Sequence, residues 1–262
     1  METPRNIAAI NTNPFSRAFK GLEELFEHNT PWAIIILVFG ALGTVTQFIP
    51  TDTQPSTDAS QVTTNAVSGV GMDGRVVLFI IGFGLIVLFV VAIITTYFEG
   101  IIAYVTWKTS KGQKAGFGEA FSAVSRRFWT IFVVEVLISL KIIGGLLLFI
   151  VPGIRALLRY EMVLLPVFDE NLTATKAMGR VKKLTRKHLM EVSGIATVGT
   201  IIPVIGTLLQ MGGEAVMYPE LKALENHDGP LPKVHWLNYI GFVLIGLLVI
   251  AGLGIFALLN TI

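Results

Sequence analysis

One unusually long apolar run most restricts the folds that this chain can adopt. From Val76 to Trp107 the run contains a single charged residue, Glu99. A helix needs about 20 apolar residues to cross the hydrocarbon core of a bilayer, so this run is long enough to span it and must also tilt, bend or project beyond it. Because 53% of the 262 residues are hydrophobic, the chain is too apolar for an ordinary soluble domain. We therefore predict an all-α integral membrane protein.

Other apolar segments bring the predicted number of transmembrane helices to six or seven. Pro152-Gly153 is expected to turn the chain between two of them. The segment 189–218 contains Pro203, and it is either a hairpin of two short helices or one kinked span. Residues 1–13 are polar and predicted to be disordered, and 224–235 form a polar linker. The predicted spans are residues 31–50, 75–107, 128–151, 153–168, 189–218 and 236–262. The last of these is a separate C-terminal span, and the others belong to a membrane core at 14–223.

Three segments have the apolar spacing of amphipathic helices, with apolar residues at i, i+3, i+4 and i+7. They are residues 14–29, 117–127 and 172–188. We expect them to lie on the cytoplasmic membrane surface, with the apolar face toward lipid. Each precedes an apolar hairpin, or a segment that can be drawn as one. This shared order raises the hypothesis of a threefold helix-hairpin repeat.

The distribution of charge predicts the orientation. The loop 108–127 carries five basic residues against one Glu, and the loop 169–188 carries six basic residues against two acids. The loop 51–74 has no lysine or arginine. Under the positive-inside rule, the N-terminus, both basic loops and the surface helices are cytoplasmic. The chain is thus expected to be a multi-pass protein of the inner membrane.

The basic helix at 172–188 is the clearest predicted binding feature. Each cation near an anionic leaflet contributes about 1 kcal/mol of attraction, so the helix is expected to contact the headgroups of anionic phospholipids. The plainer alternative is that these residues only enforce topology. Nucleic acid is not an expected partner, because no aromatic residues alternate with the basic ones. The predicted headgroup contacts are Lys176, Arg180, Lys182, Lys183, Arg186 and Lys187.

Charged residues inside the predicted spans form a second candidate set. Ionisable groups at that depth are costly unless paired or hydrated. Lys141 and Glu214 are candidate partners for each other, and Glu135 lies nearer the cytoplasmic end of its span. Either a structural ion pair or a pathway for an ion or substrate would explain them. The remaining members of the set are Arg155 and Arg159, which are expected to reach the outer headgroups or to pair with Glu161.

No enzymatic signature is found in the sequence. A GxSxG elbow, an HExxH zinc motif and a P-loop are all missing, and the chain has no cysteine. The four histidines lack ligand spacing. We therefore predict no catalytic residue, metal or cofactor. The leading functional hypothesis is a membrane-organising, lipid-contacting or assembly subunit, with a second copy or another membrane protein as a candidate partner. The alternative is a small transporter or channel that uses Glu135, Lys141 and Glu214.

Several short motifs lie along residues 118–218. They are Pro152-Gly153-Ile154, Arg159-Tyr160, Pro166-Val167, Asp169-Glu170-Asn171, Ala177 and the ending Tyr218-x-x-Leu221. In these motifs the segment resembles a broad group of bacterial multi-span membrane domains of unknown function, which also occur as the membrane domain of some glycerophosphodiester phosphodiesterases. The resemblance implies a six-helix membrane core with inner surface helices, to which 236–262 adds a span, and it implies no activity.

Overall fold

The computed structural model describes residues 10–48, 74–202, 204–225, 227 and 231–259. Every regular element within these ranges is an α-helix and none is a strand, in agreement with the predicted all-α class. Three sequence predictions fall on residues outside these ranges. They concern most of the polar N-terminal tail, the loop 51–74 except for its last residue, and part of the linker at 224–235.

Three described helices are long and apolar enough to cross a membrane. They are α3 (Gly74–Ser110), α4 (Phe117–Leu148) and α10 (Trp236–Leu259). With 37 residues at ~1.5 Å each, α3 extends over about 55 Å. Its first half has few protein neighbours: Leu78 is 70% exposed and Ile94 is 62% exposed, as expected for a helix surrounded by lipid. The finer prediction of six or seven spans is not confirmed.

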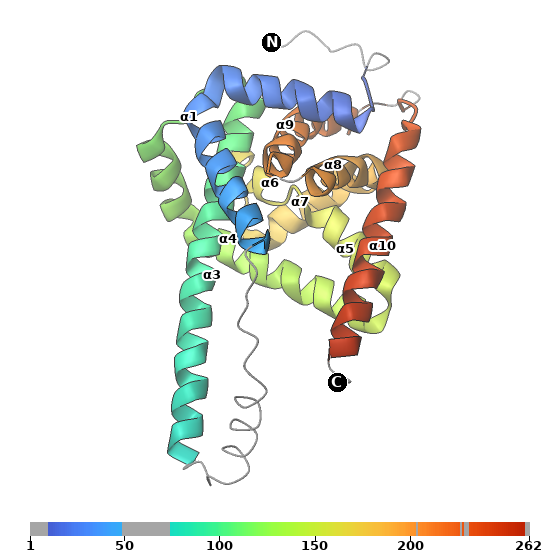
Figure 1. The fold of residues 1–262 in the computed structure, drawn as a ribbon. Coiled ribbons are helices and arrows are strands. Elements are labelled where there is room, and N and C mark those ends of the chain that lie inside the picture. Colours follow the sequence, from blue (N-terminus) through green and yellow to red (C-terminus); the bar gives the residue numbers. More distant parts are fainter. Residues whose placement is uncertain (1–9, 49–73, 203, 226, 228–230, 260–262) are drawn as a thin grey trace.

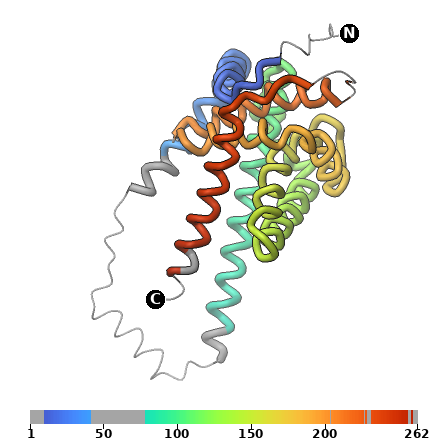
Figure 2. The backbone as a smooth tube through the Cα atoms, turned by 90° about the vertical axis from the view of Figure 1, so that its right-hand side faces the viewer, coloured from blue at the N-terminus to red at the C-terminus, as the bar shows by residue number. Residues whose placement is uncertain are grey.

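Helix α1 (Pro14–Phe48) consists of two helices that meet at Asn29, where φ is −132° and ψ is 36°. Pro31 follows this break, where its missing N–H costs little at the start of the second helix. The Asn29 side chain stabilises the bend, because its amide donates to the Thr109 hydroxyl (2.9 Å) and to the Gln113 carbonyl (3.0 Å). The first half of α1 lies across the ends of α3 and α10 (Figure 1), and Figure 2 views it nearly along its axis.

Helices α4 and α5 (Ile150–Tyr160) form a hairpin whose turn is the extended residue Phe149. The turn therefore precedes Pro152-Gly153, which was predicted to make it. Pro152 instead occupies the first turn of α5, where helices tolerate proline. A Cβ on Gly153 would collide with Leu146, so the glycine allows α5 to pack closely on α4. The predicted return span at 153–168 is interrupted, because α5 ends and the short α6 (Leu164–Asp169) follows.

The basic helix α7 (Ala174–Thr185) does not turn its apolar face toward lipid. Ala177 and Val181 are 0% exposed, and both belong to the main core cluster of the protein. The expectation of a lipid-facing apolar surface on this helix is therefore wrong. The physical reason is that an amphipathic pattern shows that one face is apolar but not whether protein or lipid covers it.

The segment 189–218 is a hairpin of two helices, the first of the two alternatives that the sequence left open. These helices are α8 (Leu189–Ile201) and α9 (Gly206–Leu224). They pack on each other, with Gly199 against Gly206 and Ile195 against Gly213. At ~1.5 Å per residue, the 13 residues of α8 extend over only about 20 Å, less than the ~30 Å hydrocarbon core.

The most extensive contact between two helices joins α1 to α9, although they are far apart in the sequence. The two backbones meet at Gly21 and Gly212. A Cβ on Gly21 would overlap the Gly212 carbonyl group, so only glycine permits this approach. Further along α1, Gly40 lies against the backbone of Val204, beside the turn between α8 and α9. Helix α1, which contains the first predicted span, therefore packs along the hairpin of α8 and α9.

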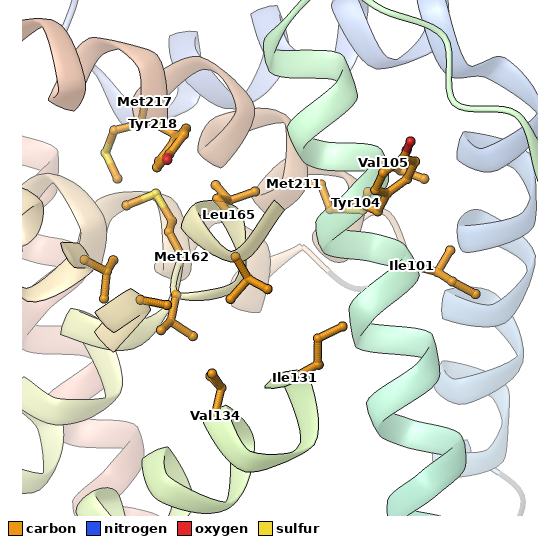
Figure 3. Close-up of a cluster of buried hydrophobic side chains, with 14 of the residues drawn as sticks. Ile101, Tyr104, Val105, Ile131, Val134, Met162, Leu165, Met211, Met217 and Tyr218 are labelled. Carbon is orange, nitrogen blue, oxygen red and sulfur yellow. The ribbon is translucent and has the colours of Figure 1, made fainter. Parts of the chain in front are cut away.

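The hydrophobic core lies where the second half of α3 meets α4, α6 and α9. Figure 3 shows side chains of α3, α4, α6 and α9 that belong to this core, together with Met162 from the turn between α5 and α6. The threefold repeat is not confirmed. The segment 117–127 continues unbroken into α4, whereas the segment 14–29 and α7 each end at a break. The labelled core residues are Ile101, Tyr104, Val105, Ile131, Val134, Met162, Leu165, Met211, Met217 and Tyr218.

Candidate functional site

Four glutamates from different parts of the chain line neighbouring cavities. Glu99 of α3 lines three of them, with volumes of about 320, 270 and 390 Å³. It shares the first with Glu161 and Glu214, the second with Glu135 and Glu161, and the third with Glu135. The structure thus brings three of the predicted intramembrane residues to one place. It also adds Glu99, which the sequence analysis noted but did not include among the candidates.

Neutral side chains, rather than cations, contact these carboxylates. The Thr96 hydroxyl donates to Glu135 Oε2 at 3.2 Å. The Gln210 amide donates to Glu161 Oε1, and it also donates to Glu214 Oε1 at 3.2 Å. Within the described ranges, no lysine, arginine or histidine forms an ion pair with any of the four glutamates. Glu135 Oε1 is buried and has no hydrogen-bond partner.

The predicted pair between Lys141 and Glu214 does not form. Lys141 Nζ instead donates to the Tyr160 hydroxyl at 3.2 Å and lies 5.0 Å from the centre of the Tyr160 ring. The physical reason is the connection of the helices. Lys141 lies on α4, whose hairpin partner is α5, while Glu214 lies on α9, which packs mainly on α1.

The predicted partners of Glu161 are also not its partners in the structure. Arg155 is exposed, Arg159 is half-buried, and neither forms an ion pair with Glu161 in the part of the chain that the structure describes. The Arg159 carbonyl accepts a hydrogen bond from the Thr185 hydroxyl at 3.4 Å, which links α5 to the end of α7. Glu161 takes the Gln210 amide instead.

The six predicted headgroup contacts divide into two groups. Arg180 is half-buried and held within the protein, because its guanidinium contacts Glu170 at 2.9 Å and Glu225 at 2.6 Å. Lys183 also reaches Glu225, at 2.8 Å, but its side chain is 71% exposed. The remaining four are exposed and form no ion pair with any described residue, and they are Lys176, Lys182, Arg186 and Lys187.

Asp169 is the centre of a polar network that joins α3 to α9. Its carboxylate accepts hydrogen bonds from Trp107 Nε1 (3.0 Å), the Tyr218 hydroxyl (3.0 Å) and Lys222 Nζ (2.6 Å), and it pairs with Lys111 (3.0 Å). Burial alone would raise the pKa of this carboxyl group. The hydrogen bonds from Lys222, Trp107 and Lys111 outweigh burial and hold the pKa well below its ordinary value.

This network revises the role of the Asp169-Glu170-Asn171 motif. Acidic residues and an asparagine directly before a helix commonly stabilise its N-terminus, and these three residues precede the basic helix. In the structure the N-cap of α7 is Thr173, and the positive φ of Asn171 (56°) turns the chain toward it. Asp169 and Glu170 instead connect helices, since Glu170 pairs with Arg180 and with Lys222.

A second buried network was not predicted from the sequence. Arg17 of α1 is 3% exposed and pairs with Glu191 of α8 (2.7 Å) and Glu220 of α9 (2.9 Å). Glu191 also contacts His188 Nδ1 at 2.7 Å. The helical spacing of Arg17 with Pro14, Ala18, Gly21 and Leu25, which are buried, is the signal that could have placed it on the inner face.

No three histidine or carboxylate side chains in the described segments are arranged to hold a metal ion. No protein-family model, curated protein or solved structure matches the chain. The resemblance of residues 118–218 to bacterial multi-span domains therefore stays a prediction.

Proposed function

We propose that this protein is a multi-pass inner-membrane protein, without catalysis of its own, that contacts anionic phospholipids at its cytoplasmic side. One observation carries the proposal. Helix α7 buries its apolar face in the core and turns a row of exposed cations outward. The cations are Lys176, Lys182 and Lys183 on the helix and Arg186 and Lys187 in the turn directly after it, and only Lys183 forms an ion pair with a described residue.

The fixed position of α7 strengthens this surface. Because the other side of the helix is anchored by Ala177, Met178 and Val181, the charges are presented without the entropy cost of ordering a free helix. Each cation near an anionic leaflet contributes about 1 kcal/mol, so five together attract strongly even after partial screening. Phosphate groups are natural ligands for such a surface.

The first half of α1 supports a position at the inner interface. Phe15, Phe19 and Phe26 share one side of this helix and are 36%, 51% and 38% exposed. Lys20 and Glu23 lie on another side and are exposed to water. A helix that divides its surface between protein, apolar side chains and charges suits the boundary between lipid and water.

Under the positive-inside rule the basic loops are cytoplasmic. The hairpin of α8 and α9 then determines on which side α10 begins. A hairpin returns the chain to its starting side, so α10 begins in the cytoplasm and ends outside. Because the chain has no cysteine, single cysteines report on sides directly. An impermeant thiol reagent should label Ser60→Cys in intact cells and leave Lys183→Cys unlabelled, and labelling at position 183 would reverse the orientation.

The lipid proposal is tested by the thermal stability of the full-length protein in nanodiscs. We expect a higher Tm in a mixture of phosphatidylglycerol and phosphatidylcholine than in phosphatidylcholine alone. The difference should shrink as salt rises from ~0.1 M to ~1 M, because the screening length falls from ~10 Å to ~3 Å. Glutamine at all five exposed cationic positions of α7 and the turn after it should remove the difference, whereas arginine at the four lysines should keep it. Equal Tm values in both lipids would refute the proposal.

A second candidate function, passage of protons or small cations, is favoured by the cavities around Glu99. Glu99 and Glu135 line the same two cavities, where two carboxyl groups can share a hydrogen bond when one of them is protonated. The buried, unpartnered Glu135 Oε1 needs such a proton or a cation. In proteoliposomes with an internal pH dye, Glu99→Gln should abolish flux, while the surface variant Glu23→Gln should not. An inactive wild-type protein would dismiss this candidate.

A further inference from the structure

A small cavity lies where the end of α7, the turn into α8 and the end of α9 meet. Its volume is about 230 Å³. Leucines form part of its wall, and among them Leu184, Leu221 and Leu224 are no more than 5% exposed. Polar groups line the remainder: Lys183, Arg186, Lys187, His188, Glu225 and His227. The cavity therefore combines a cationic rim with an apolar floor.

Among the described residues of this lining, Glu225 is the one carboxylate, and it is already neutralised. Glu225 pairs with Arg180 at 2.6 Å and with Lys183 at 2.8 Å. The hydrogen bonds from Arg180, and then from Lys183, lower the pKa of Glu225, so that it stays ionised and bound to these two cations. Arg186 and Lys187 form no ion pair with any residue that the structure describes. Their charges remain available to a ligand.

The histidine at the turn is held in a defined tautomer. Glu191 is paired with Arg17 and can only accept from the imidazole, so His188 carries its proton on Nδ1 toward Glu191. His188 Nε2 is then the ring nitrogen that this network does not use. The ring is 6% exposed, and its place in the cavity wall is fixed by the buried network below it.

We propose that this cavity, the phosphate pocket, binds a phosphate-bearing anion, which in the membrane is the headgroup of an anionic phospholipid. This inference rests on the proposed lipid contact of α7 and names its specific site. Arginine binds phosphate oxygens in a bidentate geometry, and lysine adds a point charge beside it. The volume is below the ~300 Å³ at which pockets for larger ligands begin, so a single phosphate group with few attached atoms fits.

The experiment compares two phosphate sources with the full-length protein in a neutral detergent, by titration calorimetry. The probes are inorganic phosphate and short-chain dihexanoyl phosphatidic acid, with dihexanoyl phosphatidylcholine as the neutral control. We expect saturable binding of one phosphatidic acid and none of the phosphatidylcholine. Binding of inorganic phosphate at the same site would identify free phosphate as an additional source, and its failure to bind would identify the lipid as the source.

The variants separate a built pocket from a diffuse surface charge. Arg186→Gln with Lys187→Gln should weaken phosphatidic acid binding about tenfold or more. The control pair Lys176→Gln with Lys182→Gln removes the same amount of charge from α7 itself, outside the cavity lining, and should weaken binding less than about threefold. Leu231→Trp fills the cavity without changing charge and should also block binding. Tm values verify that each variant is folded.

Two failures are distinguishable. If both double variants weaken binding equally, or if Leu231→Trp leaves it unchanged, the phosphate pocket is wrong while the salt-dependent lipid preference of α7 stands. If the wild-type protein shows no preference for anionic nanodiscs yet binds phosphatidic acid through Arg186 and Lys187, the lipid-contact function is wrong and the pocket stands.

Discussion

The side chain of Asp169 is only 6% exposed, whereas Glu99 is exposed and lines cavities between helices, and opposite kinds of charge surround these two carboxylates. Two lysines, a tryptophan N–H and a tyrosine hydroxyl contact Asp169. Glu99 shares its cavities with Glu135, Glu161 and Glu214, and no described cation pairs with any of them.

This difference separates charges that stabilise the fold by pairing within the protein from charges whose counter-ions must come from lipid or solution. Around Asp169, and again around Arg17, opposite charges are matched across helices that are distant in sequence. Around Glu99, four carboxyl groups line neighbouring cavities, and their mutual repulsion falls when protons or cations neutralise some of them. The exposed cations of α7 are the complementary case, for which an anion must come from the lipid or the solution.

The strongest test of the matched networks is the removal of Arg17. Arg17→Met leaves Glu191 and Glu220 enclosed without this cation, and breaking a buried pair costs about 3–5 kcal/mol. We expect a loss of this size in the free energy of unfolding, measured by denaturant titration in detergent. Adding Glu191→Gln should recover part of the loss. An Arg17→Met variant as stable as the wild-type protein would show that this network does not hold α1 to α8 and α9.

A smaller loss is expected at Asp169. Asp169→Asn keeps the shape of the side chain but removes the charge that Lys222 and Lys111 contact, and we expect a loss of about 1–3 kcal/mol. The exposed Glu27→Gln is the matched control. A loss below that of the control would contradict a structural role for this network.

The stability difference between the wild-type protein and Asp169→Asn should also depend on pH. The folded pKa of Asp169 lies below the unfolded value of ~3.9, so its stabilising effect is fully present above that value and is lost as pH falls through the folded pKa. The stability difference between wild type and Asp169→Asn should therefore stay constant from neutral pH down to about pH 5 and shrink below about pH 4. A difference that vanishes near neutral pH would contradict this assignment.

Lys141 should matter less than a paired membrane charge would. Among the described residues, its ammonium group interacts with the Tyr160 hydroxyl and ring, and a cation–π contact of this kind contributes about 0.5–1 kcal/mol. Lys141→Met should reduce the unfolding free energy by no more than that. Tyr160→Phe keeps the ring and removes the hydroxyl, so it tests the hydrogen bond separately. A loss of several kcal/mol on Lys141→Met would restore the hypothesis of a carboxylate partner.

The smallest effect on stability is expected in the cavities. Glu99→Gln removes one of several like charges, so the unfolding free energy should stay within about 1 kcal/mol of the wild type, and any change should be an increase. Glu23→Gln on the surface of α1 provides the comparison. A clear decrease on Glu99→Gln would mean that a cation does pair with Glu99, and the contrast with Asp169 would then be lost.

Many elements of the fold could be predicted from apolar length and from proline. The long run 76–107 becomes α3, and the run after Trp236 becomes α10. The predicted surface helix 14–29 ends at the observed break, and Pro203 falls between two helices. The turn before α5 was misplaced by a few residues, because proline is tolerated in the first turn of a helix as well as before it.

The candidate site could be predicted only in part. Glu135, Glu161 and Glu214 were identified by their depth in apolar segments, because a charge there is costly wherever its partner lies. That all three would line the same group of cavities as Glu99 could not be predicted from the sequence. Lys141 was assigned to the wrong partner for the same reason: depth along a span gives no information about which helix lies beside it.

Local sequence thus accounts for what each segment is, since helical period, apolar length and the positive-inside bias are properties of neighbouring residues. Contacts between segments have a different origin. Gly21 contacts Gly212 because the backbones of α1 and α9 approach closely. Arg17 reaches Glu191 because α8 packs beside both α1 and α9. The amphipathic pattern of α7 likewise does not determine whether protein or lipid covers its apolar face. Its apolar face packs in the core because α4, α5 and α6 lie there to cover it.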